Sequence, residues 1–300
     1  MAFLNRLIVS IIQLLPKRVV KRFAMHYIAG ERLEDAVRVL KGLNSRKMMG
    51  TLDVLGENVT TKKESLLAVR ECEKILHAID ENHLDANLSI KLTQFGLKID
   101  EAFCYGNVKR LLEIARGYKD FVRIDMEDSS TTSATLELYE KLRGDGFDNT
   151  GVVIQAYLRR SEEDVRRLVD LKANVRLCKG IYVEPEDIAF KDREEIRRNY
   201  LKLLEMLLDT SCYAGIATHD DVLVRGAYQL VRERNLRKSD YEFQMLYGVR
   251  PKLRDGIVAD GHRLRVYVPF GEQWYPYSIR RFKENPQIAR YVLAALFSRR

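Results

Sequence analysis

Residues 122–126 read Val-Arg-Ile-Asp-Met, residues 136–142 read Leu-Glu-Leu-Tyr-Glu-Lys-Leu, and residues 152–158 read Val-Val-Ile-Gln-Ala-Tyr-Leu. The first and third segments are short, near-continuous apolar runs, which are typical of strands buried on both faces of a parallel sheet. The middle segment carries its apolar residues at helical spacing. The stretch therefore predicts a strand, a covering helix and a second, parallel strand.

The same unit recurs along most of the chain. Segments with helical periodicity separate the apolar runs, and the capping-box pattern Thr61-Lys62-Lys63-Glu64 precedes one of them. Eight strands about 30 residues apart, each followed by a helix, predict an α/β fold of the (β/α)8 TIM-barrel type. The predicted strands are 51–55, 88–92, 122–126, 152–158, 175–178, 215–218, 242–246 and 264–268.

An open, doubly wound sheet is the alternative, and it often carries a GxGxxG nucleotide motif. Gly144-Asp145-Gly146 begins such a pattern, but Asn149 replaces the third glycine and the segment follows a helix, so we interpret it as a helix-ending loop. No linker divides the chain. We expect one domain, with an N-terminal helical arm over 1–48 (helices near 4–28 and 31–47) and a barrel over 49–300.

Composition supports a globular protein with its own core, since 46% of the residues are apolar and 31% are charged. The four cysteines form no CxxC pair, which favours reduced thiols and a cytoplasmic location. The net charge of +8 comes from basic residues interleaved with acidic ones, a pattern typical of solvated helix faces. We therefore expect no nucleic-acid partner.

Basic residues cluster near the N-terminus, where Lys17, Arg18, Lys21 and Arg22 follow the apolar run 7–15. That run is shorter than the about 20 residues that a membrane span needs. It lacks the cleavage site of a secretory signal. Two interpretations remain, a helix packed on the body of the protein or an interfacial helix on anionic lipid, which would place the protein at the inner face of the membrane.

Polar side chains stand at the end of nearly every predicted strand. In a β/α barrel these carboxyl ends form the mouth, where active sites lie, and a purely structural barrel would not need such residues there. The sequence therefore predicts an active site at the mouth. The residues are Lys91, Asp125, Gln155, Arg176, Lys179, Gly180, Thr218, His219, Gln244 and Tyr267.

Lys91 and Asp125 end neighbouring strands, so we expect them to form an ion pair. This pair either closes the barrel structurally or offers a positive charge to an anionic substrate. A Schiff base on Lys91, as in a barrel aldolase, is a further alternative. His219 has no other histidine at ligand spacing, and we expect no metal.

The last predicted helix begins near Pro276 and carries Tyr277, Arg280, Arg281 and Glu284 on one face or nearly so. Two guanidinium groups, one of them held by an acid, suit a carboxylate because arginine binds carboxylates through two hydrogen bonds. An ordinary amphipathic helix with an ion pair would show the same pattern. This segment alone does not decide between the two.

Taken together, these segments resemble the proline dehydrogenase family, and the likeness spans residues 80–297. Each segment falls at a strand end or on the last helix, in the same order as in the family. Seven motifs in register are far more specific than one. They are 89–92, 122–128, 176–182, 216–220, 241–248, 265–271, and 277–281 with Glu284.

The resemblance implies a distorted (β/α)8 barrel with FAD across the mouth and a final helix over the substrate, L-proline. FMN is the alternative flavin. Lys91, Asp125 and Arg176 would be catalytic, with Asp125 supporting Lys91 and Arg176 lying near flavin N5. The proline site would comprise Lys91, Tyr182, Leu246, Tyr267, Tyr277, Arg280, Arg281 and Glu284. The flavin site would comprise Asp125, Gln155, Arg176, Lys179, Gly180, Thr218, His219 and Gln244.

The chemistry implied is hydride transfer from C5 of proline to the flavin, which yields pyrroline-5-carboxylate without a strong general base. The chain lacks the aldehyde dehydrogenase module of the bifunctional relatives, so the product would be released or passed to a separate pyrroline-5-carboxylate dehydrogenase. Electrons would pass to a quinone or another membrane acceptor. The competing interpretation without catalysis is a basic, membrane-associated binding protein on a barrel scaffold.

Overall fold

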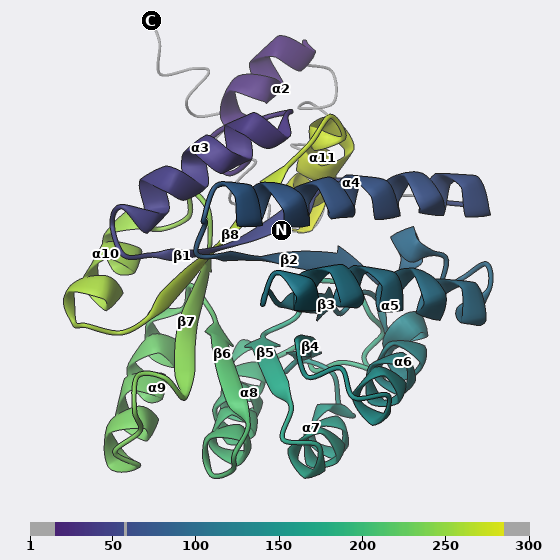
Figure 1. Cartoon of the computed structure of the whole chain (residues 1–300). Helices are drawn as coiled ribbons and strands as arrows, with labels where there is room; N and C mark the ends of the chain where they lie inside the picture. Colours follow the sequence, from purple (N-terminus) through teal and green to yellow (C-terminus); the bar gives the residue numbers. More distant parts are fainter. Residues whose placement is uncertain (1–15, 57–58, 285–300) are drawn as a thin grey trace, which may run out of the picture.

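Eight parallel strands close into a barrel in the computed structural model, which describes residues 16–56 and 59–284. Each strand pairs with the next in sequence, and β1 pairs with β8 to close the ring (Figure 1). The predicted TIM-type barrel is therefore confirmed. The strands are β1 Met49–Val54, β2 Ala86–Lys91, β3 Val122–Asp125, β4 Thr150–Gln155, β5 Asn174–Cys178, β6 Tyr213–Ala217, β7 Tyr241–Leu246 and β8 Leu264–Phe270.

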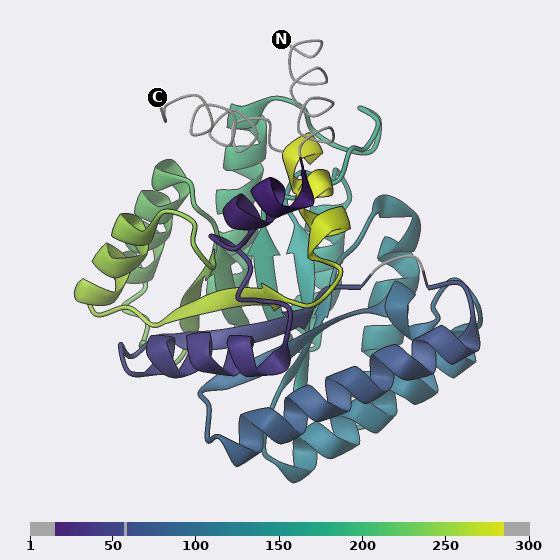
Figure 2. The ribbon, with the colours of Figure 1, turned by 90° about the horizontal axis from the view of Figure 1, so that it is seen from above.

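Helices surround the barrel (Figure 2), and the core lies between them and the outer face of the strands. The short 3-10 helices η1 and η2 precede α5 and α6. The helices are α2 Lys17–Ala24, α3 Leu33–Asn44, α4 Lys62–Glu81, η1 Leu92–Phe95, α5 Glu101–Gly117, η2 Ser129–Thr131, α6 Thr132–Gly144, α7 Ser161–Asp170, α8 Arg193–Leu208, α9 Asp221–Glu233, α10 Pro251–Ala259 and α11 Trp274–Glu284.

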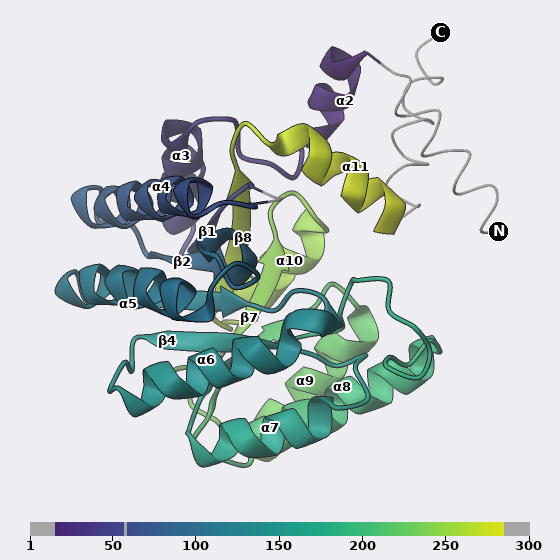
Figure 3. The same cartoon turned by 90° about the vertical axis from the view of Figure 1, so that its right-hand side faces the viewer.

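The last helix does not cover β8 as it would in a regular barrel. The N-terminal helix α3 contacts β1 and β8 instead, and α11 packs against α2 (Figure 3). Trp274 and Tyr277 of α11 share a small apolar cluster with Val20 of α2 and with Leu55, which follows β1 at the mouth. The predicted distortion, a final helix displaced to the mouth, is thus present. Of the two predicted arm helices, the described part contains 17–24 and 33–44, and residues 1–15 lie outside it.

Side-chain caps fix where several helices begin. Thr61 accepts a hydrogen bond from the Glu64 amide at 3.2 Å, and Glu64 accepts one in return from the Thr61 amide at 3.0 Å, which confirms the predicted capping box. The segment 144–146 follows α6, with Gly146 at a φ of +82° that suits glycine. The interpretation of this segment as a helix-ending loop is correct.

The prediction of near-continuous apolar strands is wrong for six of the eight strands, because their residues alternate between polar and apolar. Polar side chains point into the barrel and meet across it: Arg176 of β5 contacts Asp125 of β3 and Gln244 of β7. Apolar neighbours such as Ile124 and Leu177 face the helices. Both faces are buried, but one face is stabilised by ion pairs and hydrogen bonds instead of apolar packing. The alternating strands are β1, β2, β3, β5, β7 and β8.

Candidate active site at the barrel mouth

Lys91 ends β2 directly beside Asp125 of β3 in the strand register. Its Nζ lies 2.5 Å from Oδ1 of Asp53 on β1 and 3.9 Å from Oδ2 of Asp125. The predicted ion pair with Asp125 is therefore present but is the longer of two. The main support of Lys91 is Asp53, which is 2% exposed and which the sequence pattern did not indicate.

Burial alone would lower the pKa of Lys91, but the carboxylates of Asp53 and Asp125 outweigh burial and raise it above its ordinary value. The Tyr182 hydroxyl makes a smaller contribution that also raises the pKa of Lys91. A lysine with a raised pKa is a cation at neutral pH. It can attract an anion but is a poor nucleophile, which disfavours the Schiff-base alternative.

Asp125 of β3 accepts hydrogen bonds from side chains on three other strands, β2, β5 and β8. Its Oδ1 accepts hydrogen bonds from Arg176 at 2.6 Å and from Ser89 at 3.0 Å, and its Oδ2 accepts one from the Tyr267 hydroxyl at 2.7 Å. The Arg176 guanidinium also lies over the Tyr267 ring, 5.1 Å from its centroid. Asp125 is thus positioned to orient Arg176 and Tyr267 more directly than Lys91.

Arg176 keeps one unused donor. Its Nε donates to Gln244 and its Nη1 to Asp125 and Ser89, but the buried Nη2 has no hydrogen-bond partner within residues 16–56 and 59–284. A buried donor without a partner is costly, and native structures rarely leave one. An acceptor on a bound group would satisfy it.

The other predicted flavin-site residues line the same end of the barrel. Gln155 donates to the Glu127 carbonyl at 2.9 Å, Lys179 pairs with Asp220 at 3.1 Å, and Thr218 accepts from the Asp220 amide. His219 accepts from the Leu246 amide at 2.9 Å through Nε2, a hydrogen-bonding role. No cluster of metal-ligating side chains occurs in the described part of the chain.

Gly180 turns the chain sharply after β5, with a φ of +105°. A Cβ atom at this position would lie 2.0 Å from the Tyr157 ring, so only glycine fits. The loop that follows is fastened by Glu184, whose two oxygens accept hydrogen bonds from the Ser129 amide at 2.7 Å and the Ser129 hydroxyl at 2.6 Å. These contacts anchor the loop that carries Tyr182.

The substrate-side residues are described only in part. Tyr277 is 4% exposed and lies near enough to Tyr267 to contribute to the raised pKa of Tyr267, after burial and the carboxylates of Asp125 and Asp53. Leu246 ends β7 at the same mouth. The helix α11 includes Arg280, Arg281 and Glu284, but their side chains lie outside the described part, so the predicted clamp is neither confirmed nor contradicted.

Residues that the sequence pattern did not indicate include Asp53, Ser89 and Glu184. Asp53 and Ser89 sit inside strands, where an apolar residue would be the default, and that alternation was the available signal. Glu184 lies in a loop that the sequence could not place. Its partner Ser129 is 55 residues away in the chain.

The family model for proline dehydrogenase matches residues 36–292, which include all eight barrel strands and α11. The chain belongs to the proline dehydrogenase family. It is accordingly an oxidoreductase of proline catabolism that acts on a CH–NH donor. Membership of this family also implies a flavin cofactor.

Curated relatives agree with the family assignment. The chain is 39% identical over 276 residues to Proline dehydrogenase 1 of Bacillus subtilis subsp. natto, covering 92% of this chain and 91% of the relative. It is 34% identical to Proline dehydrogenase of Deinococcus radiodurans, covering 91% and 89%. The similarity to these proline dehydrogenases extends over nearly the full length of both chains.

Among solved structures, proline utilization A from Bdellovibrio bacteriovorus inactivated by N-propargylglycine superposes with a TM-score of 0.82 and 26% identity. The match covers 88% of this chain and 33% of that one, so the chain spans about a third of the solved protein. The Bifunctional protein PutA of Escherichia coli is 29% identical over 89% of this chain and 23% of the relative. The proline dehydrogenase similarity is confined to that part of the larger proteins.

Proposed function

We propose that this enzyme oxidises L-proline to pyrroline-5-carboxylate with a tightly held FAD at the barrel mouth. The observation that carries the proposal is Arg176, a buried guanidinium fixed on two sides by Gln244 and Asp125 with one donor unused. A flavin is a flat group with several ring acceptors, and one of them would satisfy Nη2. FMN stays the alternative flavin, since it carries the same ring system.

The residues present fit such a group. Gln155, Arg176, Lys179, Gly180, Thr218, His219 and Gln244 would hold it, since all belong to β4–β7 or to the segments that follow those strands. When bound, the flavin supplies the redox chemistry by accepting hydride at N5. Arg176 then contributes a fixed positive charge, which requires no reorganisation during the reaction.

The opposite side of the mouth would bind the substrate. Lys91 provides a buried cation for the proline carboxylate, and Arg280 and Arg281 would complete the clamp with Glu284 orienting one of them. Tyr182, Leu246, Tyr267 and Tyr277 would enclose the ring and exclude water. Because Lys91 is protonated and cannot act as a base, proline would react with its amine already neutral.

We propose a membrane quinone as the electron acceptor. The proposal is supported by exposed Arg18 and Arg22 on α2, the helix that packs against α11. Among the described residues, no helix is both long enough and apolar enough to span a bilayer. The product would be released or passed to a separate pyrroline-5-carboxylate dehydrogenase.

The direct test is turnover with a soluble dye as electron acceptor. We expect dye reduction that depends on L-proline, with pyrroline-5-carboxylate formed in equal amount and trapped as its aminobenzaldehyde adduct. Dye reduction without the adduct would refute oxidation at C5.

Tyr267 should select proline over hydroxyproline. Its ring lies at the mouth, and in the resembling family a tyrosine here packs where an added hydroxyl would project. A hydroxyl buried there without a partner costs about 1–3 kcal/mol. Hydroxyproline should thus be poorer by roughly one to two decades in kcat/KM, since about 1.36 kcal/mol is tenfold. Tyr267→Ser should narrow this ratio.

The matched control is Tyr267→Phe, which removes the hydrogen bond to Asp125 but keeps the ring. We expect it to lose stability and to keep the discrimination. If kcat/KM ratios for the two substrates are the same in wild type and Tyr267→Ser, the tyrosine only packs the barrel.

Membrane binding should depend on the N-terminal basic residues. Removal of residues 1–15 combined with Arg18→Glu and Arg22→Glu should abolish binding to anionic liposomes, whereas dye-coupled activity should persist. Val20 and Ala24 must stay, because they pack with Trp274 and Tyr277. Arg166→Glu with Arg232→Glu, on the distant α7 and α9, is the charge-matched control. Binding that survives in the first variant would assign the contact to another surface.

A further inference from the structure

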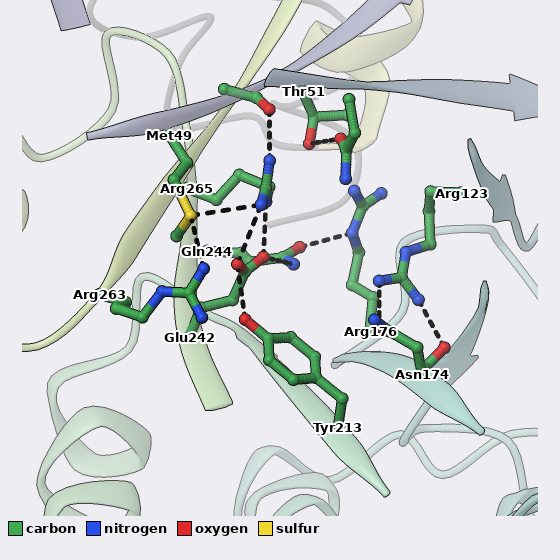
Figure 4. A network of polar contacts seen from close by, with 12 residues as sticks. Met49, Thr51, Arg123, Asn174, Arg176, Tyr213, Glu242, Gln244, Arg263 and Arg265 are labelled. Carbon is green, nitrogen blue, oxygen red and sulfur yellow. Dashed lines mark hydrogen bonds and ion pairs between the residues drawn. The ribbon is translucent and has the colours of Figure 1, made fainter. Parts of the chain in front are cut away.

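A chain of hydrogen bonds runs through the barrel from its floor to Arg176 (Figure 4). At the floor, Arg265 donates to Oε1 of Glu242 at 2.7 Å, and Tyr213 donates to Oε2 of Glu242 at 2.8 Å. Gln244 donates to Oε1 of Glu242 at 2.6 Å and accepts from Nε of Arg176 at 2.6 Å. These residues connect the amino ends of the strands to the mouth.

The floor itself is hollow, with a cavity of about 490 Å³ whose lining includes Tyr213, Glu242 and Arg265. It opens at the amino ends of the strands, opposite Lys91 and Asp125. The chemistry of barrels of this type takes place at the carboxyl ends. We therefore do not place substrate in this cavity, and we ask instead what the charged residues beside it do for the site above them.

Both carboxylate oxygens of Glu242 accept hydrogen bonds. It is 2% exposed, and burial alone would raise its pKa, but Arg265 outweighs burial and holds the pKa below its ordinary value. An ionised carboxylate has no proton to donate. Whatever faces Oε1 of Glu242 must therefore be a donor.

This requirement orients the amide of Gln244. Only its NH2 group can face Glu242, so its carbonyl oxygen must face the other way, toward Nε of Arg176. Gln244 is 5% exposed, and a Cβ atom at Gly215 would lie 2.5 Å from its Nε2, so glycine at position 215 leaves just enough room for the amide. A reversed amide would present NH2 to Nε of Arg176, donor against donor.

We propose that Glu242 is a positioning residue, which sets the orientation of Gln244 and through it the position of Arg176 at the mouth. This inference rests on the proposed function, in which Arg176 faces the flavin. Arg176 is then held by two acceptors, the amide oxygen of Gln244 and the carboxylate of Asp125, and its free Nη2 is aimed by both.

Glu242→Gln tests the proposal because it keeps the shape and removes the acceptor-only character. Arg265 Nε donates to the same Oε1 as Gln244, so an amide at position 242 can face Gln244 with either end only when Arg265 is replaced as well. Glu242→Gln with Arg265→Met therefore makes both orientations of the Gln244 amide available. We expect the rate of flavin reduction by proline to fall roughly tenfold to hundredfold, because small displacements of a positioned group have effects of this size. The two-electron potential of the flavin should fall by about 30 mV for each tenfold loss of preference for its reduced form.

Tyr213→Phe is the matched control. It removes one hydrogen bond from the same carboxylate, on the oxygen that Gln244 does not use, and leaves Glu242 an obligate acceptor. We expect a lower melting temperature but a flavin potential and reduction rate within about twofold of wild type. If Glu242 only stabilises the floor, both variants should lose stability and neither should change the flavin.

Breaking the pair with Arg265 can prevent folding of Glu242→Gln, so Glu242→Gln with Arg265→Met provides a second variant without an unpaired buried charge. The same decrease in reduction rate and potential is expected. Wild-type potential and rate in the folded double variant would overturn the inference. A wild-type enzyme that proline does not reduce would overturn the proposed function instead, so the two failures are distinguishable.

Discussion

Arg281→Met should decrease kcat/KM for proline by a factor of roughly 30 to several thousand, because the proposed carboxylate clamp would lose one partner of a charge pair, at a cost of about 2–5 kcal/mol. Arg280→Met should act in the same direction. Both residues follow Tyr277, which α11 buries at the mouth, by one helical turn. The decrease should appear mainly in KM, since the carboxylate is bound in the ground state as well as in the transition state.

Arg22→Met is a suitable control for these variants. Arg22 is exposed on α2, the helix against which α11 packs, so its replacement removes a nearby charge that we do not assign to the substrate site. With a soluble dye as acceptor it should leave proline kinetics unchanged. Unchanged kinetics in both Arg280→Met and Arg281→Met would exclude the carboxylate clamp and leave Lys91 as the anion site.

Asp125→Asn should impair both stability and turnover. Asp125 accepts hydrogen bonds from Arg176, Ser89 and Tyr267. Asparagine would present an NH2 group to one of these donors and leave the 6% exposed Arg176 without its carboxylate. Breaking a buried pair costs about 3–5 kcal/mol of the free energy of unfolding. We expect a melting temperature several degrees lower and a decrease of at least about a hundredfold in kcat.

Ser89→Ala is the control that distinguishes the effect of the Asp125 charge from the effect of a neutral hydrogen bond to the same carboxylate. It removes the donor to Oδ1 of Asp125 and should cost only about 1 kcal/mol. The comparison measures the melting temperature and the dye-coupled kcat of Ser89→Ala and Asp125→Asn side by side. Equal effects of Ser89→Ala and Asp125→Asn would mean that the carboxylate charge has no special role.

The barrel was predictable because its signal is repeated. Eight strands and their intervening helices recur at regular spacing, and the motif carrying Asp125 ends a strand where a barrel places its active site. The apolar pattern did not predict that the side chains inside the barrel are largely polar. Arg176, Glu242 and Gln244 point inward, and they are stabilised by partners on strands far away in sequence, which no local pattern can indicate.

The sequence predicted the positions of individual polar residues at strand ends better than it predicted which residues contact one another. Lys91 was identified from its place at a strand end, but its nearest carboxylate is Asp53, on the strand before it. The sequence predicted the longer pair with Asp125 because both residues end their strands. The structure shows both carboxylates beside Lys91, with Asp53 at 2.5 Å and Asp125 at 3.9 Å from Nζ.

The central claim, a flavin at the barrel mouth that proline reduces, is tested most directly by the visible spectrum of the purified protein. We expect a yellow protein whose flavin band is bleached when L-proline is added without oxygen, and an unchanged band when D-proline is added. A colourless protein that stays inactive after incubation with FAD and with FMN would contradict the account.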